Sequence, residues 1–361
     1  MKIALVYDRV NKWGGAERVL LALHKLFPQA PLYTSVYNKK KAPWANVFDV
    51  RTSFLQNFPF ATHHELYAPL MPLAFENFNF DEYDLVISVT SEAAKGIITK
   101  SSTKHICYCL TPTRYLWSGY DEYFKNPLLK FLSKPIVGYL RFWDKIAANR
   151  PDYFIAISKE VKERIKKYYG RESTVVYPPV EAFSSLASSV QLGDKKLDAE
   201  RSFFLIVSRL VPYKKIGLAI KVFNKLKLPL KIVGTGSEMG KLKGIAGPNV
   251  EFLGTLTDKE LVGYYSGCKA LIFPGIEDFG LTVLEAQSFG KAVIAFKKGG
   301  ALETIVNGKT GLFFDKQTVE SLEEQINKFN NLTFSPKDCI EQAEKFSFEN
   351  FKKQFIEMLK I

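Results

Sequence analysis

Two glutamates stand eight residues apart in the segment ALIFPGIEDFGLTVLEAQSFG. The apolar run Leu271–Phe273 predicts a buried strand that ends at Pro274, and Gly280 marks the expected start of a helix. Glu277 falls in the short loop between them and Glu285 in the early turns of the helix. Carboxylates accept paired hydrogen bonds from vicinal hydroxyls, so one glutamate is suited to a sugar and the other to a ribose.

The same junction is suited to a diphosphate. Glycine at position 280 lets the backbone approach a ligand closely. The N–H groups of Leu281 and Thr282 and the helix dipole favour negative charge.

Neutralising a diphosphate requires cations, and the segment SRLVPYKK supplies Arg209 and Lys214 after another apolar run. Arginine offers a planar fork of donors and lysine a compact charge, a pair that fits a leaving diphosphate. A solvated pair of loop residues remains the alternative.

Two glycine pairs follow predicted strands. Gly14 and Gly15 in NKWGGAERVLLAL predict a tight turn that opens a helix, although they do not match the GxGxxG fingerprint. Gly234 and Gly236 in KIVGTGSE predict either a ligand-binding loop or a plain turn. Both interpretations stay open for the second pair.

Short apolar runs alternate with helix-period stretches through the whole chain, which predicts parallel sheets with helices on both faces. The break is expected at VVYPPVE, where Pro178 and Pro179 interrupt regular structure before the polar stretch 182–200. We therefore expect an α/β protein with two Rossmann-like domains, 1–178 and 179–345, whose parallel sheets face a central cleft. A final helix is expected over 346–361.

The chain of 361 residues is long enough for two cores, and 47% hydrophobic with 24% charged residues excludes a disordered or fibrous protein. Its net charge of +13 suggests an anionic partner: nucleic acid, a membrane surface or a phosphorylated small molecule. Residues 1–178 carry +9 and residues 179–361 carry +4. The segment 125–171 alone carries +8.

The segment FKNPLLKFLSKPIVGYLRFWDKIAANR interleaves cations with large apolar side chains. It predicts either a helix packed on the sheet with solvated lysines or a helix that docks on an anionic membrane. Only the part before Arg141 is expected to suit lipid, because the rest leads straight into a predicted strand at YFIAIS.

The N-terminus MKIALVYDRV reads as a buried strand and not as a signal peptide, and no segment approaches twenty consecutive apolar residues. The cytoplasm is the expected compartment. Cys107 and Cys109 alternate with Tyr108, which favours two small side chains on one face of a strand over metal binding. No D-x-D metal motif is present, since Asp81-Glu82-Tyr83-Asp84 lacks its spacing.

These residues carry a resemblance. Glu277 to Glu285 resembles the E-x7-E motif of glycosyltransferase family 4, retaining nucleotide-sugar transferases of the GT-B fold. SRLVPYKK resembles that family's phosphate-binding segment and WGGAER its N-terminal glycine loop. HICYCLTPTRYLW, YFIAIS and VVYPPVE follow in the family's order, so the likeness spans nearly the whole chain. It is most similar to bacterial enzymes that add mannose to lipid-linked glycans.

The resemblance implies that Arg209 and Lys214 bind the donor diphosphate. Glu277 would contact the transferred sugar together with the backbone of Asp278, Phe279, Gly280 and Leu281. Glu285 would hold the ribose. Gly14 and Gly15 would approach the phosphate and acceptor. It also implies that the 346–361 helix packs back on the first domain.

Arg114, Tyr115 and Trp117 are the acceptor-side candidates. The family often has a histidine before the Thr-Pro of this loop, and here that position is Leu110. His63, His64 and His105 lie elsewhere in the sequence, so a histidine contribution from this loop is not expected.

The resemblance thus implies a retaining transferase without a cofactor, and the absence of a D-x-D motif predicts that it acts without a divalent metal. It would move a hexose, first of all mannose from GDP-mannose, to a lipid-linked or glycan acceptor of bacterial surface polysaccharide or O-antigen. A GT-B sugar-nucleotide epimerase and a basic nucleic-acid-binding protein are the alternatives. Peripheral contact with the inner face of the cytoplasmic membrane is left open, and no nucleic-acid partner is expected.

Overall fold

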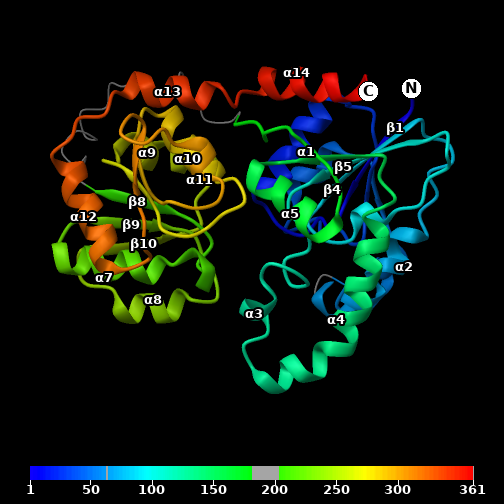
Figure 1. The fold of residues 1–361 in the computed structure, drawn as a ribbon, viewed down its shortest axis with the longest axis horizontal. Helices are drawn as coiled ribbons and strands as arrows, with labels where there is room; N and C mark the ends of the chain where they lie inside the picture. The colour runs from blue at the N-terminus through cyan, green and yellow to red at the C-terminus, as the bar shows by residue number, and fades with distance from the viewer. Residues whose placement is uncertain (62–63, 181–202, 361) are drawn as a thin grey trace. The chain divides into compact units, whose positions relative to one another are not determined.

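The computed structural model describes residues 1–61, 64–180 and 203–360. The chain divides into two compact units, Met1–Pro178 and Pro179–Ile361, and each is an α/β layer structure (Figure 1). The polar stretch 182–200 lies outside the described residues. The helix expected over 346–361 is present as α14 (Phe348–Leu359) and is part of the second unit. Its packing on the first unit stays a prediction.

The first unit is built on a seven-stranded parallel sheet in the order β3-β2-β1-β4-β5-β6-β7. Its strands are β1 (Ile3–Tyr7), β2 (Leu32–Thr34), β3 (Val50–Thr52), β4 (Leu85–Thr90), β5 (Lys104–Cys109), β6 (Tyr153–Ala156) and β7 (Thr174–Val175). The chain order reverses between β1 and β4. In open α/β sheets a ligand binds beyond the carboxyl ends of the strands at such a switch point.

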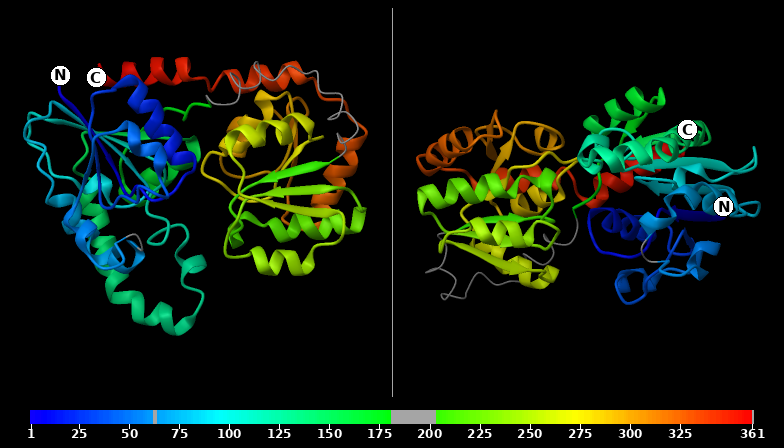
Figure 2. Two further views of the ribbon diagram at one scale, coloured as in Figure 1. Left: turned by 180° about the vertical axis from the view of Figure 1, so that it is seen from behind. Right: turned by 90° about the horizontal axis from the view of Figure 1, so that it is seen from below.

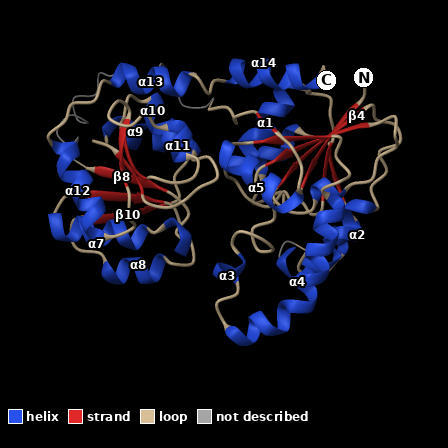
Figure 3. Ribbon diagram, viewed as in Figure 1, coloured by secondary structure: helices blue, strands red, loops and turns tan. Residues whose placement is uncertain are grey.

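Helices cover both faces of this sheet (Figure 3). They are α1 (Gly15–Leu26), α2 (Met71–Glu76), α3 (Tyr120–Tyr123), α4 (Pro127–Ala147) and α5 (Lys159–Tyr169), with 3-10 turns η1 (Pro43–Val47), η2 (Phe54–Asn57), η3 (His64–Leu70) and η4 (Ala94–Gly96). On one face, buried Val6 and Val86 of the central strands pack with Phe75 of α2 and Trp143 of α4. The inner side of α4 is therefore part of the core.

The second unit has a six-stranded parallel sheet in the order β10-β9-β8-β11-β12-β13. Its strands are β8 (Phe204–Val207), β9 (Leu230–Val233), β10 (Val250–Gly254), β11 (Leu271–Phe273), β12 (Val293–Phe296) and β13 (Gly311–Phe314). Its helices, beside α14, are η5 (Pro212–Lys214), α7 (Ile216–Leu226), α8 (Met239–Ile245), α9 (Asp258–Gly267), α10 (Leu281–Ser288), α11 (Ala301–Thr304), α12 (Val319–Asn330) and α13 (Pro336–Glu344). The switch point lies between β8 and β11.

Alternating side chains of the strands fill two separate cores in this unit, as the two-residue period of a strand requires. Phe204 and Ile206 of β8 point into the core that contains Phe223 of α7. Leu205 of β8 points into the opposite core with Tyr265 of α9 and Val283 of α10. Figure 2 shows the resulting helix layers on either side of the sheet.

The structure confirms most of the predicted elements. The strand at Leu271–Phe273 and the helix that begins after Gly280 are β11 and α10. Cys107 and Cys109 lie two residues apart on β5 as buried free thiols, as predicted. The two parallel sheets confirm the α/β fold class.

The structure differs from the expectation that the residues after Arg141 lead straight into a strand. Asn126 caps α4, its side chain accepting hydrogen bonds from the N–H groups of Leu128 and Leu129. The helix then continues past Arg141 to Ala147, and Phe142 and Ile146 are exposed. The outward apolar side chains thus extend beyond Arg141, because the turn into β6 comes only after the helix has ended.

Candidate active site

The residues predicted to bind a diphosphate gather at the switch point of the second unit. The loop after β8 carries Arg209 and leads through η5 to Lys214, and the loop after β11 carries Glu277. Because β8 and β11 are neighbours in a parallel sheet, the two loops start from the same edge. Segments far apart in the sequence therefore form one group of charged side chains.

Lys214 and Glu277 form an ion pair across the two loops. Lys214 is buried and its ammonium group lies 5.2 Å from the centre of the Tyr213 ring, while Glu277 is half-buried. Arg209 is exposed, and its guanidinium donates a hydrogen bond to the Tyr213 hydroxyl at 2.8 Å. The loop thus holds two cations next to one tyrosine, Arg209 at its hydroxyl and Lys214 near its ring, and the buried Lys214 is paired with the carboxylate.

The start of α10 completes this group. Gly280 precedes the helix with φ at +90°, in the left-handed region that disfavours residues with a side chain. Phe279 is buried against Phe346, with ring centres 5.6 Å apart, and Asp278 is half-buried. The loop before the helix is therefore fixed by packing on one side.

The first turn of α10 carries a hydroxyl that the described residues do not satisfy. Thr282 follows Leu281 at the start of the helix, and its Oγ1 is buried without a hydrogen-bond partner within the described chain. The first N–H groups of any α-helix also lack partners inside the helix. A bound anion would supply acceptors for both kinds of donor.

Glu285 is buried and accepts a hydrogen bond from the Tyr265 hydroxyl at 2.7 Å. Tyr265 comes from α9 and is itself fully buried, stacked on Phe289 with ring centres 5.8 Å apart. A buried, oriented carboxylate is unlike the usual surface glutamate. The sequence gives no signal for Tyr265, because the contact depends on how α9 packs beside α10.

Gly234 and Gly236 do follow a buried strand, and the structure shows what their small size allows. A Cβ at Gly234, where φ is +127°, would lie 1.9 Å from the Ser208 carbonyl oxygen, and one at Gly236 would lie 2.3 Å from that of Leu210. The loop after β9 therefore presses against the loop that carries Arg209. A contact between these glycines and a ligand stays a prediction.

A third glycine pair, Gly299 and Gly300, was not singled out from the sequence. A Cβ at Gly299 would lie 2.5 Å from the Glu277 carbonyl oxygen, and one at Gly300 would lie 2.3 Å from the Cα of Phe279. The Gly300 N–H also donates to the Glu277 carbonyl at 2.9 Å. The available signal was a Gly-Gly step shortly after the strand AVIAF and just before a helix, as the Gly-Gly step of WGGAER also precedes a helix.

In the first unit the glycine turn differs from its prediction. α1 begins at Gly15 itself, and Gly14 has a φ of 176°, an extended conformation that other residues also adopt. No left-handed turn is needed here, since the bend before the helix is made over several residues. Glu17 of α1 was not among the predicted site residues. It is buried and accepts a hydrogen bond from the Tyr7 hydroxyl at 2.6 Å.

The loops at the switch point of the first unit are joined by Asp8 and Arg9, which the sequence did not reveal as partners. The Asp8 carboxylate accepts hydrogen bonds from Thr90 Oγ1 at 2.8 Å and from the Ser91 N–H at 2.6 Å. Burial raises the pKa of Asp8. Arg9 lies 2.5 Å from the Glu92 carboxylate. Charged groups thus cross-link the loops after β1 and β4.

The three acceptor-side candidates lie in the loop after β5. The Trp117 indole N–H donates to Asp144 Oδ2 at 2.7 Å, so this side chain has a structural partner. Burial, followed by the charge of Glu92, raises the pKa of Tyr115. Arg114, directly before Tyr115 in the sequence, is half-buried. Leu110, where the resembling family often has histidine, is buried.

Asp144 connects this loop to the rest of the unit. Its Oδ1 lies 2.5 Å from the ammonium group of Lys95 and accepts a hydrogen bond from Thr113 Oγ1 at 3.1 Å. Lys95 and Asp144 are both fully buried, and this ion pair was also missed from the sequence. A buried charge pair with several hydrogen bonds holds the loop after β5 firmly against α4.

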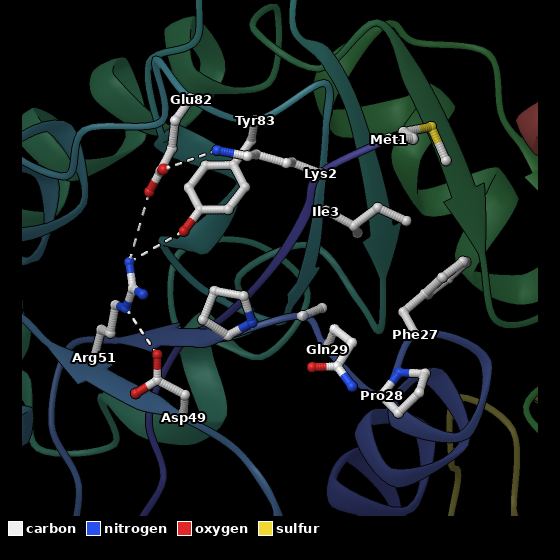
Figure 4. A pocket seen from close by; sticks show the side chains of 12 residues that line it. Met1, Lys2, Ile3, Phe27, Pro28, Gln29, Asp49, Arg51, Glu82 and Tyr83 are labelled. Atoms are coloured by element: carbon white, nitrogen blue, oxygen red, sulfur yellow. Dashed lines mark hydrogen bonds and ion pairs between the residues drawn. The ribbon is translucent and has the colours of Figure 1, made fainter.

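A cavity of about 490 Å³ lies at the opposite edge of the first unit's sheet, where β1 begins (Figure 4). Arg51 donates there to Tyr83 at 3.1 Å and to Asp49 at 3.0 Å, and Lys2 lies 3.5 Å from Glu82. The charges of this cavity therefore pair with one another. Ligands of open α/β sheets bind at the other edge.

Each unit thus carries its own set of predicted residues. Arg209, Lys214, Glu277 and Glu285 belong to the second unit, and Gly14, Gly15 and the 114–117 loop belong to the first. The central cleft between the sheets stays a prediction. Within the described residues, no group of three His, Cys, Asp or Glu side chains is arranged to hold a metal ion. Over the same residues, no helix has the length and apolarity needed to cross a membrane.

Comparison with known proteins adds a family model. The model of glycosyl transferases group 1 matches residues 191–346, which lie in the second unit. The chain is 25% identical over 215 residues to an uncharacterized glycosyltransferase of Methanocaldococcus jannaschii, covering 57% of this chain and 58% of that protein. The chain thus spans less than two thirds of this relative's length.

Two further relatives carry named activities. The alpha-1,3/1,6-mannosyltransferase ALG2 of Dictyostelium discoideum is 29% identical over 327 residues, covering 76% of this chain and 74% of that protein. The O-antigen chain mannosyltransferase C of Escherichia coli is 26% identical over 230 residues, covering 61% and 58%.

Among solved structures, HepE from Anabaena in complex with UDP and glucose matches with a TM-score of 0.74 at 20% identity, over 100% of both chains. At this identity the match concerns the fold alone, which is the two-domain α/β GT-B fold. The family model and the mannosyltransferase relatives together support a glycosyltransferase.

Proposed function

We propose that the protein is a retaining glycosyltransferase that moves a hexose from a nucleotide sugar to a lipid-linked or glycan acceptor. The observation that carries this proposal is the group at the switch point of the second unit. Two cations, a carboxylate paired with one of them and the start of α10 meet there. Such a group matches a ligand that joins an anionic diphosphate to a polyhydroxylated sugar.

Each residue then has a role in holding the donor. Lys214 and Arg209 neutralise the diphosphate, and the first turn of α10 donates to its oxygens through backbone N–H groups and the Thr282 hydroxyl. Glu277 accepts hydrogen bonds from the transferred sugar. Glu285, oriented by Tyr265, accepts them from the ribose hydroxyls.

In the proposed reaction the bond between the anomeric carbon and the donor phosphate oxygen breaks, and the acceptor oxygen forms a bond to the same carbon on the same face. The acceptor proton passes to the departing phosphate oxygen. Arg209, Lys214 and the α10 N-terminus stabilise the charge that develops there, so a divalent metal is not required.

Mannose from GDP-mannose is the first donor to test. Its support comes from the two relatives that are named mannosyltransferases. The HepE structure was solved with UDP, so the nucleotide base of the donor has to be determined by experiment. For the acceptor, the relative named for the O-antigen chain supports a lipid-linked surface glycan.

A thermal-shift panel of GDP-, UDP-, ADP- and dTDP-sugars tests the donor class. A bound nucleotide sugar stabilises the folded state by RT ln(1 + [L]/Kd), so the matching base raises the melting temperature in a concentration-dependent way. Absence of a shift with every member of the panel contradicts the proposed donor site.

Two further assays test the reaction type. Incubation of the bound nucleotide sugar without acceptor should leave the sugar unchanged, whereas an altered sugar would identify an epimerase. Transfer should keep its full rate in a chelator. Loss of the rate in chelator with recovery on adding magnesium would contradict metal independence.

A further inference from the structure

α4 exposes an unusual number of large apolar side chains. Eight of them are between 43% and 69% exposed: Leu128, Leu129, Phe131, Leu132, Ile136, Tyr139, Phe142 and Ile146. Figures 1 and 2 show the N-terminal turns of this helix, with α3, projecting away from the sheet of the first unit. A soluble protein rarely exposes a contiguous apolar surface of this kind without a partner.

The helical period divides α4 into three strips. Val137, Leu140 and Trp143 form a buried strip that packs inside the unit. The eight exposed apolar side chains form the second strip. The third strip consists of cations at successive intervals of four, seven and four residues, namely Lys130, Lys134, Arg141 and Lys145.

The cations of the third strip are held in place by neighbours. Lys130 lies 2.6 Å from Asp121, and the Arg141 guanidinium lies 4.7 Å from the centre of the Tyr120 ring. The Lys134 ammonium lies 5.6 Å from the ring centre of Phe131, itself one of the exposed apolar residues. Positive charge is therefore fixed along one border of the apolar strip.

An apolar strip bordered by cations is complementary to the surface of an anionic bilayer. Apolar side chains enter the boundary between headgroups and acyl chains, while a border of cations faces the anionic headgroups. The segment 125–171, to which the helix belongs, carries +8. The ionisable residues within the helix, including the buried Asp144, require α4 to lie along the surface and not across it.

We propose that the strip of eight exposed apolar residues on α4 docks this protein on an anionic phospholipid leaflet, with the helix axis in the plane of the interface. The proposal goes beyond the transfer reaction, since lipid binding requires neither a donor nor an acceptor.

Docking through α4 would also affect the loop after β5, because the inner side of α4 contacts that loop. Asp144 on α4 accepts hydrogen bonds from Thr113 and Trp117 in the loop after β5. The residue that faces inward from the docked helix thus holds the acceptor-side loop. This consequence rests on the proposed function: docking would keep that loop at a fixed height above the leaflet, where the head of a lipid-linked acceptor would lie.

Vesicle sedimentation with the full chain tests the proposal directly. We expect binding to vesicles of phosphatidylcholine mixed with phosphatidylglycerol, and much weaker binding to phosphatidylcholine alone. The double variant Phe131→Gln/Phe142→Gln should weaken partition by at least about tenfold, because it removes two apolar side chains from the interface. Lys130→Gln/Lys134→Gln, which removes two cations of the third strip, should weaken binding chiefly at low salt, since exposed charges are screened at high salt.

A matched control comes from the second unit, where Leu332 and Ile340 are also exposed. Leu332→Gln/Ile340→Gln should leave vesicle binding unchanged. The melting temperature and the donor thermal shift verify that all variants fold. Because those readouts are independent of lipid, failure of docking and failure of the proposed transfer reaction remain distinguishable.

Three results would overturn the proposal. The first is equal binding to neutral and anionic vesicles, and the second is unchanged binding by the Phe131/Phe142 variant. The third is a lipid-independent dimer, seen by light scattering, that the same variant converts to a monomer, because the strip would then be covered by a second copy of the chain.

Discussion

Lys214 forms an ion pair with Glu277, and the two side chains come from the loops that follow the neighbouring strands β8 and β11. The pair is largely shielded from water, since Lys214 is buried and Glu277 is half-buried. A charge pair in this position joins the two loops of a switch point, where α/β sheets bind their ligands. The ammonium group that neutralises a donor phosphate would then already be oriented before the donor arrives.

Substitutions of this pair should reduce transfer strongly. Lys214→Ala, Glu277→Ala and Arg209→Ala are each expected to lower kcat by about 10²- to 10³-fold, the range for removal of one charged donor or acceptor at a developing charge. Lys214→Ala/Glu277→Ala should lose less than the product of the single effects, because the two residues share one interaction. Steady-state kinetics measure this. Lys221→Ala on the exposed side of α7 is the control, and near-wild-type turnover in a folded Lys214 variant would remove that residue from the site.

Tyr265 should act through Glu285. Removing its hydroxyl by Tyr265→Phe leaves the stacked ring in place but deletes the 2.7 Å hydrogen bond that orients the carboxylate. We expect Glu285→Ala to raise KM for the donor with a smaller effect on kcat, and Tyr265→Phe to raise KM in the same direction by a lesser factor. The split between KM and kcat distinguishes positioning from a loss of fold. An unchanged KM in Tyr265→Phe, with Glu285→Ala impaired, would show that the hydroxyl does not orient Glu285.

The sequence is informative where a site is built from consecutive residues. The order of strand, glycine and helix around Glu277 and Gly280 follows from local pattern alone, and the structure places β11 and α10 as expected. The parallel sheets also follow, because alternating strands and helices have few other packings. Local pattern thus predicts both the sheet edge and the cations that lie on it.

Contacts between distant segments could not be predicted in this way. Tyr265 meets Glu285 only because α9 packs beside α10, and Lys95 meets Asp144 only because α4 covers η4. Neither pair has a spacing that a sequence pattern can detect. The exposure of Phe142 was missed for a related reason: a composition of apolar residues and cations does not reveal how far a helix continues before the chain turns into the sheet.

His105 should make the first unit sensitive to acid. It is buried in β5, with its Nε2 2.8 Å from Ser88 Oγ of β4. Burial, together with the positive charges of Arg150 and Arg171, lowers its pKa to about 3. An unfolded histidine binds a proton below about pH 6.5, whereas the folded one stays neutral until about pH 3. The unfolded state therefore binds more protons in this window.

The free energy of unfolding should accordingly be fully retained above about pH 6.5 and fall as the pH drops toward 3, by up to about 1.4 kcal/mol per pH unit from this group. Urea unfolding at a series of pH values measures the slope. His105→Asn keeps a polar group near Ser88 without the titration and should show a shallower slope than the wild type. Identical slopes for the two proteins would mean that His105 is not the group responsible.

The variant Gly234→Ala tests whether the loop that carries Arg209 depends on close packing against the loop after β9. Gly234→Ala would place a Cβ 1.9 Å from the Ser208 carbonyl oxygen at a φ of +127°, so the loop after β8 must move or the variant must unfold more easily. We expect a loss of about 2–4 kcal/mol in the free energy of unfolding from the strained backbone and the overpacking. Gly240→Ala is the matched control, because nothing lies within 4 Å of its Cβ in α8, and it should stabilise the protein by about 0.5–1 kcal/mol.

In the folded fraction of Gly234→Ala, donor affinity should fall as well, since displacing Ser208 displaces Arg209. Wild-type stability and donor affinity in this variant would show that the two loops are not packed as tightly as their backbones indicate.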